Sequence, residues 1–140
     1  MKAAYIDSHG GPEVIKYGDV PDPVLKHGEV LIKVRSCALN RLDAYTRAGA
    51  RGMRKEFSGP HILGGDISGD IVEISDSVTQ IEVGDRVVVN PRLTCQECWY
   101  CRAGETELCQ RAGMIGVDRW GGYSEYVAVP SVNVYEIPDS

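Results

Sequence analysis

The chain has 140 residues, 43% of them hydrophobic, so it can bury one core and is most simply a single domain. A formal net charge of −5 and a pI near 5.2 argue against nucleic acid or an anionic membrane as the main partner. The longest apolar runs, such as 86–89, are far too short to span a membrane, and the N-terminus lacks the apolar segment of an export signal. With free cysteines and no export signal, we expect a reducing, cytoplasmic location.

Short strands separated by glycine and proline are predicted over the first third of the chain. In the third of these strands, Val30, Ile32 and Val34 alternate with charged residues, which is typical of a strand with one buried face. The predicted strands are 2–6, 14–19 and 29–36.

One helix is predicted at 40–48. Asn40 is a good N-cap, Asp43 lies in the first turn where the helix dipole favours an anion, and Gly49 is a natural C-terminal stop. We expect residues 50–60 to form a mobile surface loop, which carries Arg51, Arg54 and Lys55. A basic loop of this kind is usually only solvated, and contact with a substrate or a phosphate is the alternative.

The second half of the chain returns to strands, at 66–74, 85–90, 121–129 and 132–137. Many short strands, few helices and glycine at the bends predict a mostly β fold. We expect a largely antiparallel barrel with one or two short helices and an inserted metal lobe at about 91–113. The last residues, 137–140, look like a turn whose Ser140 could cap a helix that does not follow, so we expect a domain of a longer polypeptide.

Four of the five cysteines lie within fifteen positions and follow the pattern C-x₂-C-x₂-C-x₇-C: Cys95, Cys98, Cys101 and Cys109. A tetrahedral zinc site needs four thiolates about 2.3 Å from the metal, and the two-residue spacings let neighbouring thiolates of a tight turn converge on one ion. A turn at 103–104 would allow the fourth cysteine to fold back. Because four thiolates fill the coordination sphere, such a zinc is structural.

Three alternatives to zinc stay open for these cysteines. Adjacent C-x-x-C pairs make poor long-range disulfides, and nothing points to secretion. A redox pair is expected to open a helix in a βαβ pattern, which is not seen here. A bacterial iron–sulfur run continues with three residues and Cys-Pro, whereas here seven residues intervene and Gln110 follows.

Six motifs follow one another along the chain: G-E-V-L-I-K-V from Gly28, N-x-x-D from Asn40, G-x-D-x-x-G-x-I-V from Gly64, V-G-D-R-V from Val83, the cysteine pattern, and G-G-Y-S-E-Y from Gly121. In this order they resemble the N-terminal half of a medium-chain dehydrogenase/reductase, of the zinc-containing alcohol dehydrogenase superfamily. The resemblance implies that residues 1–140 are a GroES-like N-terminal catalytic domain. It also implies a following Rossmann NAD(P) domain, which is absent from this chain.

Two positions depart from the zinc alcohol dehydrogenases of this family. A cysteine ligand is replaced by Asn40, and the histidine of a Gly-His-Glu motif is replaced by Gly65. Two of three protein ligands for a catalytic zinc are therefore missing, and Lewis-acid chemistry is not expected there. Cys37 is interpreted as a small buried thiol instead of a substitute ligand. The histidines fall in turn-rich segments, so we expect them at the surface: His9, His27 and His61.

The segment 40–45, N-R-L-D-A-Y, is similar instead to the zinc-independent quinone-oxidoreductase branch, where Asn takes the place of the catalytic ligand. The catalytic candidates are Asn40, which would donate a hydrogen bond to a carbonyl oxygen, Tyr45, which would donate a hydrogen bond or a proton, and Asp43, which would orient the helix start. Arg41 is the candidate for the cofactor pyrophosphate. A helix cap for Asn40, core packing for Tyr45 and a solvated Arg41 are the alternatives.

The resulting hypothesis is an NAD(P)H-dependent reductase that transfers hydride to a quinone, an enone or a related small carbonyl acceptor, with a structural zinc and a preference for NADPH by analogy only. The full-length protein is expected to be a homo-oligomer through the absent half. No G-x-G-x-x-G motif is present, so this chain alone is not expected to turn over. Three alternatives remain: a fragment of a zinc-dependent alcohol dehydrogenase, a non-catalytic zinc-stabilised binding module, and a nucleic-acid-binding zinc ribbon, which the acidic balance disfavours.

Overall fold

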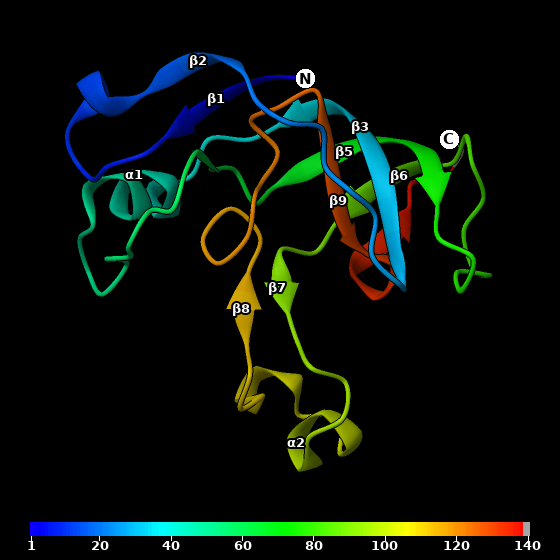
Figure 1. Cartoon of the computed structure of the whole chain (residues 1–140). Coiled ribbons are helices and arrows are strands. Elements are labelled where there is room, and N and C mark those ends of the chain that lie inside the picture. Colours follow the sequence, from blue (N-terminus) through cyan, green and yellow to red (C-terminus); the bar gives the residue numbers. More distant parts are fainter. Residues whose placement is uncertain (139–140) are drawn as a thin grey trace.

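The longest strands, β3 (Glu29–Cys37) and β5 (Ile67–Ile74), pair along most of their length and form the centre of the main sheet. The computed structural model describes residues 1–138 and gives this antiparallel sheet the strand order β10-β6-β5-β3-β9 (Figure 1). Register shifts along β3 mark bulges, which bend the strand and increase its twist. The remaining strands of the sheet are β6 (Arg86–Val89), β9 (Tyr126–Pro130) and β10 (Val134–Glu136).

The hydrophobic core lies against this sheet. In β3, Val30 and Ile32 are fully buried while Lys33 and Arg35 are exposed, so the predicted alternation is confirmed for these residues; Glu29 departs from it, because it is buried beside Arg119. Each strand of the sheet adds side chains to the same buried cluster, which includes Ile67, Ile71, Val87, Val89, Val127, Val129 and Val134.

A second, three-stranded sheet packs beside the first, with the antiparallel order β2-β1-β4. Its strands are β1 (Lys2–Ile6), β2 (Lys16–Asp19) and β4 (His61–Ile62). The strand predicted from residue 14 begins later, because the 3₁₀ helix η1 (Pro12–Val14) precedes it. The N–H of Ala4 donates to the carbonyl of Tyr123 at 2.8 Å, and this bond joins β1 to the loop before β9. The mostly β, antiparallel fold predicted from the sequence is confirmed.

The predicted helix is present as α1 (Arg41–Ala48), with Asn40 as its extended N-cap and Gly49 in the left-handed conformation at φ 66°. Residues 50–60 contain neither a helix nor a strand. They are fastened to the N-terminal turn, because the N–H of Lys55 donates to His9 Nε2 at 2.9 Å.

Two further features differ from the sequence predictions. His61 is only 5% exposed, so the expectation of a surface histidine was wrong here: the residue pairs with Ile6 as part of β4. His9 is half-buried and His27 is exposed. The strand predicted from residue 121 begins only at 126, because the N–H groups of Gly121 and Gly122 bond across the loop to the carbonyls of Ile62 and Gly64.

The cysteine segment projects from the barrel as a separate lobe (Figure 1). Its base is a two-stranded antiparallel ribbon of β7 (Arg92–Leu93) and β8 (Gly113–Met114). Between them lie α2 (Trp99–Arg102) and the 3₁₀ helix η2 (Thr106–Leu108), while η3 (Ser131–Asn133) lies in the barrel before β10. Among the described residues, no helix is long and apolar enough to cross a membrane. Part of the turn expected at 137–140, Asp139 and Ser140, lies outside the described residues.

Candidate metal centre and active site

The lobe brings the four predicted cysteines together from three short elements. Cys95 lies in the loop after β7, Cys98 caps α2, Cys101 lies within α2, and Cys109 follows η2. Gln96 has a positive φ of 60°, which turns the chain back between the first two cysteines.

The spacing of the four sulfur atoms fits a tetrahedral zinc. All four Sγ atoms lie within 4.8 Å of one another, and Cys95 Sγ is 3.6 Å from Cys109 Sγ and 3.9 Å from Cys101 Sγ. Bonds of about 2.3 Å to a central zinc require sulfur separations of roughly 3.8 Å, whereas a disulfide requires about 2.05 Å. Among residues 1–138 these cysteines form the one set of three or more histidine, cysteine or acidic side chains placed to hold an ion.

The backbone of the lobe prepares these thiols for a cation. Backbone N–H groups of Glu97 and Cys98 lower the pKa of Cys95 to about 6, and those of Cys101 and Gln110 lower the pKa of Cys98. Burial and the neighbouring thiols raise the pKa of Cys101. Because metal binding replaces thiol protons, a divalent cation would satisfy all of these sulfurs at once.

The second candidate site is built around the carboxylate of Asp43, at the start of α1. Asp43 Oδ2 accepts hydrogen bonds from the Asn40 N–H at 2.8 Å and from the Tyr123 hydroxyl at 2.8 Å. Asp43 Oδ1 accepts from the Gly64 N–H at 3.0 Å. This carboxylate therefore fastens the N-cap of the helix, the loop after β4 and the loop before β9, as the interpretation of Asp43 as an orienting residue requires.

Asn40 faces a second carboxylate. Its Nδ2 donates to Asp66 Oδ2 at 2.9 Å, and its side chain is exposed. An amide nitrogen carries two hydrogens, so one N–H remains for a ligand while Asp66 fixes the plane of the amide. Beside it, Gly65 is tightly enclosed: a Cβ at this position would lie 3.1 Å from both the Ile115 carbonyl oxygen and Pro91 Cβ.

Of the other residues considered from the sequence, Tyr45 and Arg41 lie outside this network, whereas Cys37 adjoins it. Tyr45 is half-buried and its ring lies 4.8 Å from the guanidinium of Arg51; within residues 1–138 no hydrogen bond links it to Asp43. Arg41 is exposed at the start of α1. Cys37 is half-buried, and burial followed by the carboxylates of Asp43 and Asp66 raises its pKa to about 12. It is therefore a protonated thiol at neutral pH.

A cavity of about 250 Å³ adjoins the Asp43 network beneath α1. Its lining is mostly apolar, so it suits the body of an uncharged ligand. The residues around it are Ala4, Tyr5, Ile6, Ile15, Leu39, Asn40, Asp43, Ala44, Arg47, Leu63 and Tyr123.

Two members of the network, Tyr123 and Asp66, were not among the site residues predicted from the sequence. Both lie in motifs that were used only to predict the fold: Tyr123 in the G-G-Y-S-E-Y run and Asp66 in the predicted strand 66–74. Burial and the bond to Asp43 raise the pKa of Tyr123. The signal that could have found them is a polar side chain next to a run of glycines, where the backbone approaches closely.

An antiparallel barrel that carries a four-cysteine lobe is the arrangement of a GroES-like domain with a thiolate metal centre. The family model described as "Alcohol dehydrogenase GroES-like domain" matches residues 26–139. The chain therefore belongs to this family, within the medium-chain dehydrogenase/reductase superfamily of zinc-containing alcohol dehydrogenases.

Curated relatives include the L-threonine 3-dehydrogenases of Shewanella baltica, 35% identical over 121 residues, and of Escherichia fergusonii, 36% identical over 122 residues. These matches cover 86% and 87% of this chain and 36% of each relative. The chain thus spans about a third of the length of the curated relatives that it matches.

Solved structures give the same result. An NAD-dependent alcohol dehydrogenase is 38% identical with a TM-score of 0.90, over 97% of this chain and 39% of that one. A cobalt- and zinc-bound thermostable alcohol dehydrogenase from Pyrobaculum aerophilum is 37% identical with a TM-score of 0.88, over 97% of this chain and 40% of that one.

Proposed function

We propose that this chain is the N-terminal part of an NAD(P)H-dependent reductase that transfers hydride to a quinone, an enone or a related carbonyl acceptor without a catalytic zinc. The observation that carries this proposal is the hydrogen bond of 2.9 Å between Asn40 Nδ2 and Asp66 Oδ2. An amide and a carboxylate satisfy each other there, while Gly65 offers no side chain. The pair is suited to orienting a carbonyl group and poorly suited to holding a metal ion.

The chemistry expected of the chain's own residues is positioning and charge stabilisation. Reduced nicotinamide, when bound, supplies the hydride. The free N–H of the Asn40 amide would donate to the acceptor oxygen as negative charge develops on it. Asp43, through its bonds to Tyr123 and Gly64, would hold the start of α1 in place while this happens.

The proposal assigns a single, structural zinc to Cys95, Cys98, Cys101 and Cys109. The separations of their sulfur atoms, all within 4.8 Å, support this assignment. Four thiolates leave no open position for a substrate, so this ion would stabilise the lobe and take no part in the reaction.

Metal content and activity of the full-length protein test both parts. We expect one zinc per chain, and reduction of quinones or enones by NADPH or NADH that persists when a chelator removes exchangeable metal. Asn40→Ala should lower kcat/KM by about 10²-fold, the loss typical of one oxyanion donor. The matched control is Gln80→Ala, which removes an exposed amide outside this network and outside the cavity beside it. Two zinc ions per chain, with activity lost on chelation of one, would contradict the metal-free proposal.

A second candidate is supported by the comparisons: a dehydrogenase that acts on alcohols or L-threonine, as the names of the relatives state. It predicts oxidation of these substrates with NAD⁺ and no preference for quinones. Assaying the same protein in both directions separates the two candidates. A homo-oligomer, formed through the remainder of the protein, is expected under either one.

A further inference from the structure

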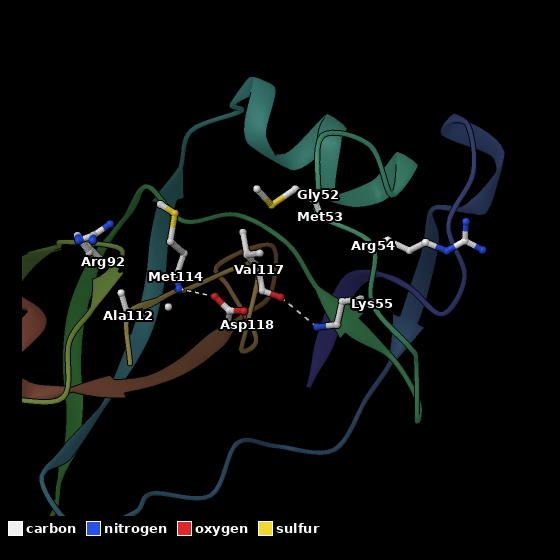
Figure 2. Close-up of a pocket in the computed structure, with 10 residues that line it drawn as sticks. Gly52, Met53, Arg54, Lys55, Arg92, Ala112, Met114, Val117 and Asp118 are labelled. Carbon is white, nitrogen blue, oxygen red and sulfur yellow. Dashed lines mark hydrogen bonds between the residues drawn. The ribbon is translucent and has the colours of Figure 1, made fainter. Parts of the chain in front are cut away.

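A cavity of about 530 Å³ lies between the 50–60 loop and the base of the metal lobe, and none of its lining residues belongs to the Asp43 network (Figure 2). We name it the Lys55 cavity. Its walls combine apolar side chains, chiefly Met53, Met114 and Val117, with charged groups. Neither the metal lobe nor the proposed reductase site accounts for it.

The charge of the Lys55 cavity is opposite to that of the whole chain. Arg54, Lys55 and Arg92 line it against a single acid, Asp118, whereas the chain carries a net charge of −5. Asp118 is already engaged, because its Oδ2 accepts the Met114 N–H at 2.7 Å. The cavity therefore has an excess of positive charge, which attracts anions.

Lys55 is the cation best placed to meet a ligand. Figure 2 shows its side chain directed toward Val117 and Asp118, while Arg54 extends away from them. Lys55 Nζ donates to the Val117 carbonyl at 3.0 Å and contacts His61 Nδ1 at 3.1 Å, which leaves one of its three hydrogens for a further acceptor. Burial lowers the pKa of Lys55, so an anion beside it would compensate a charge that the protein only partly solvates.

Arg92 provides a second unmet donor at the opposite end. Its Nη2 donates to the Glu107 carbonyl at 2.6 Å, but its buried Nε has no hydrogen-bond partner among the described residues. Buried polar atoms are nearly always paired, so Arg92 is a cation whose hydrogen-bonding capacity the described residues do not fully use.

We propose that the Lys55 cavity binds a small organic anion, a carboxylate or a phosphate monoester, with the charged group at Lys55 and the apolar body against Met53 and Met114. Methionine side chains adapt to irregular apolar shapes, and together with Val117 they suit a short hydrocarbon part. The test of this inference does not depend on the proposed reductase function, because binding can be measured without turnover.

The test uses methyl NMR on the zinc-loaded chain, since two of its three methionines line the cavity and Met1 serves as an internal reference. Butyrate and butyl phosphate are titrated against ¹³C-methyl-methionine protein, with butyramide as the uncharged match for butyrate and inorganic phosphate as the anion without an apolar body. We expect both organic anions to shift the Met53 and Met114 signals and to leave Met1 unchanged, with butyramide binding about tenfold more weakly than butyrate.

Variants of Lys55 then test whether its positive charge binds the anion. Lys55→Met should weaken butyrate binding about tenfold, and Lys55→Arg should retain most of it. Lys33→Met, at an exposed lysine on β3, is the matched control and should leave binding unchanged. Equal binding of butyrate and butyramide, or no shift of Met53 and Met114 with any anion, overturns the proposal without reference to any variant.

The role of the anion is decided on the full-length protein. If the bound anion is the substrate, acceptors that carry a carboxylate should lose kcat/KM in Lys55→Met while neutral acceptors keep theirs. If it is an effector, butyrate should change turnover of neutral acceptors, and Lys55→Met should abolish that change.

Discussion

At the scale of single residues, the environment of His61 determines its protonation. His61 Nε2 lies 3.1 Å from the Gly116 carbonyl, which can only accept, so Nε2 carries the hydrogen and Nδ1 accepts from Lys55. Burial and the positive charge of Lys55 lower the pKa of His61 to about 4. The neutral ring is therefore the form that the fold requires.

This environment predicts an acid-labile contribution to stability. In the unfolded chain His61 has a pKa near 6.5, against about 4 in the fold, so the unfolded state binds the proton first as the pH falls. The contribution is complete above pH 6.5 and is lost between pH 6.5 and 4, and it amounts to roughly 3 kcal/mol. Urea unfolding of the wild type and of His61→Gln across this range measures it. Equal pH slopes for the two proteins would show that His61 is not the group responsible.

A buried ion pair makes a second residue-scale prediction. The Glu29 side chain is 7% exposed and its Oε1 accepts from Arg119 Nη1 at 2.8 Å, while Arg119 Nη2 donates to the Ala128 carbonyl at 2.6 Å. Arg119→Leu leaves a buried carboxylate without its partner and should cost about 3 kcal/mol in urea unfolding. The double variant Glu29→Leu/Arg119→Leu should be less destabilised than Arg119→Leu alone, since no unpaired charge remains. A double variant that is more destabilised would contradict this explanation.

At the scale of elements, those with a local signal were predicted and those set by distant partners were not. α1 was found because Asn40, Asp43 and Gly49 specify its two ends, and β3 was found because its side chains alternate. β4 is only two residues long and exists because β1 lies beside it. No local pattern in the sequence predicts such a strand, so the burial of His61 could not be predicted.

In the candidate sites, too, residues close in sequence could be predicted and contacts between distant residues could not. The cysteine set could be read from its spacing, because the ligands are close in sequence. The bond from Tyr123 to Asp43 joins residues 80 positions apart and depends on how the start of α1 meets the loop before β9, which spacing cannot give.

The metal lobe supplies an element-scale prediction. The ribbon at the base of the lobe consists of only two residue pairs between β7 and β8, so we expect the lobe to unfold separately when zinc is removed. The two tryptophans report on the two parts: Trp99 lies in α2, and Trp120 Nε1 donates to the Pro60 carbonyl in the barrel at 2.9 Å. A chelator should change Trp99 emission in the Trp120→Phe variant and leave Trp120 emission in Trp99→Phe unchanged.

Cys98→Ser should reproduce the effect of the chelator on Trp99, and Cys37→Ser, outside the lobe, serves as the matched control. A simultaneous change at both tryptophans would mean that the lobe and the barrel unfold as one unit.

At the scale of the whole molecule, the match to about a third of each relative's length defines what this chain can be expected to do alone. The barrel, the lobe and the Asp43 network are complete within it, but it has no glycine-rich dinucleotide motif. We therefore expect one zinc per chain and no measurable NADPH binding, as followed by the fluorescence of the reduced nicotinamide. The control is the full-length protein, which should bind the cofactor. Tight NADPH binding by the 140-residue chain would show that this chain recognises dinucleotides by itself.

The ribbon of β7 and β8 has one more consequence. Leu93 and Gly113 face each other in its last pair, so the segment between them leaves the barrel and returns at adjoining points. A segment tethered in this way can be exchanged for a tight reverse turn without rerouting any strand of the barrel. We therefore expect that a related gene could lose the cysteine lobe, and with it the proposed demand for metal, while the barrel keeps the same fold.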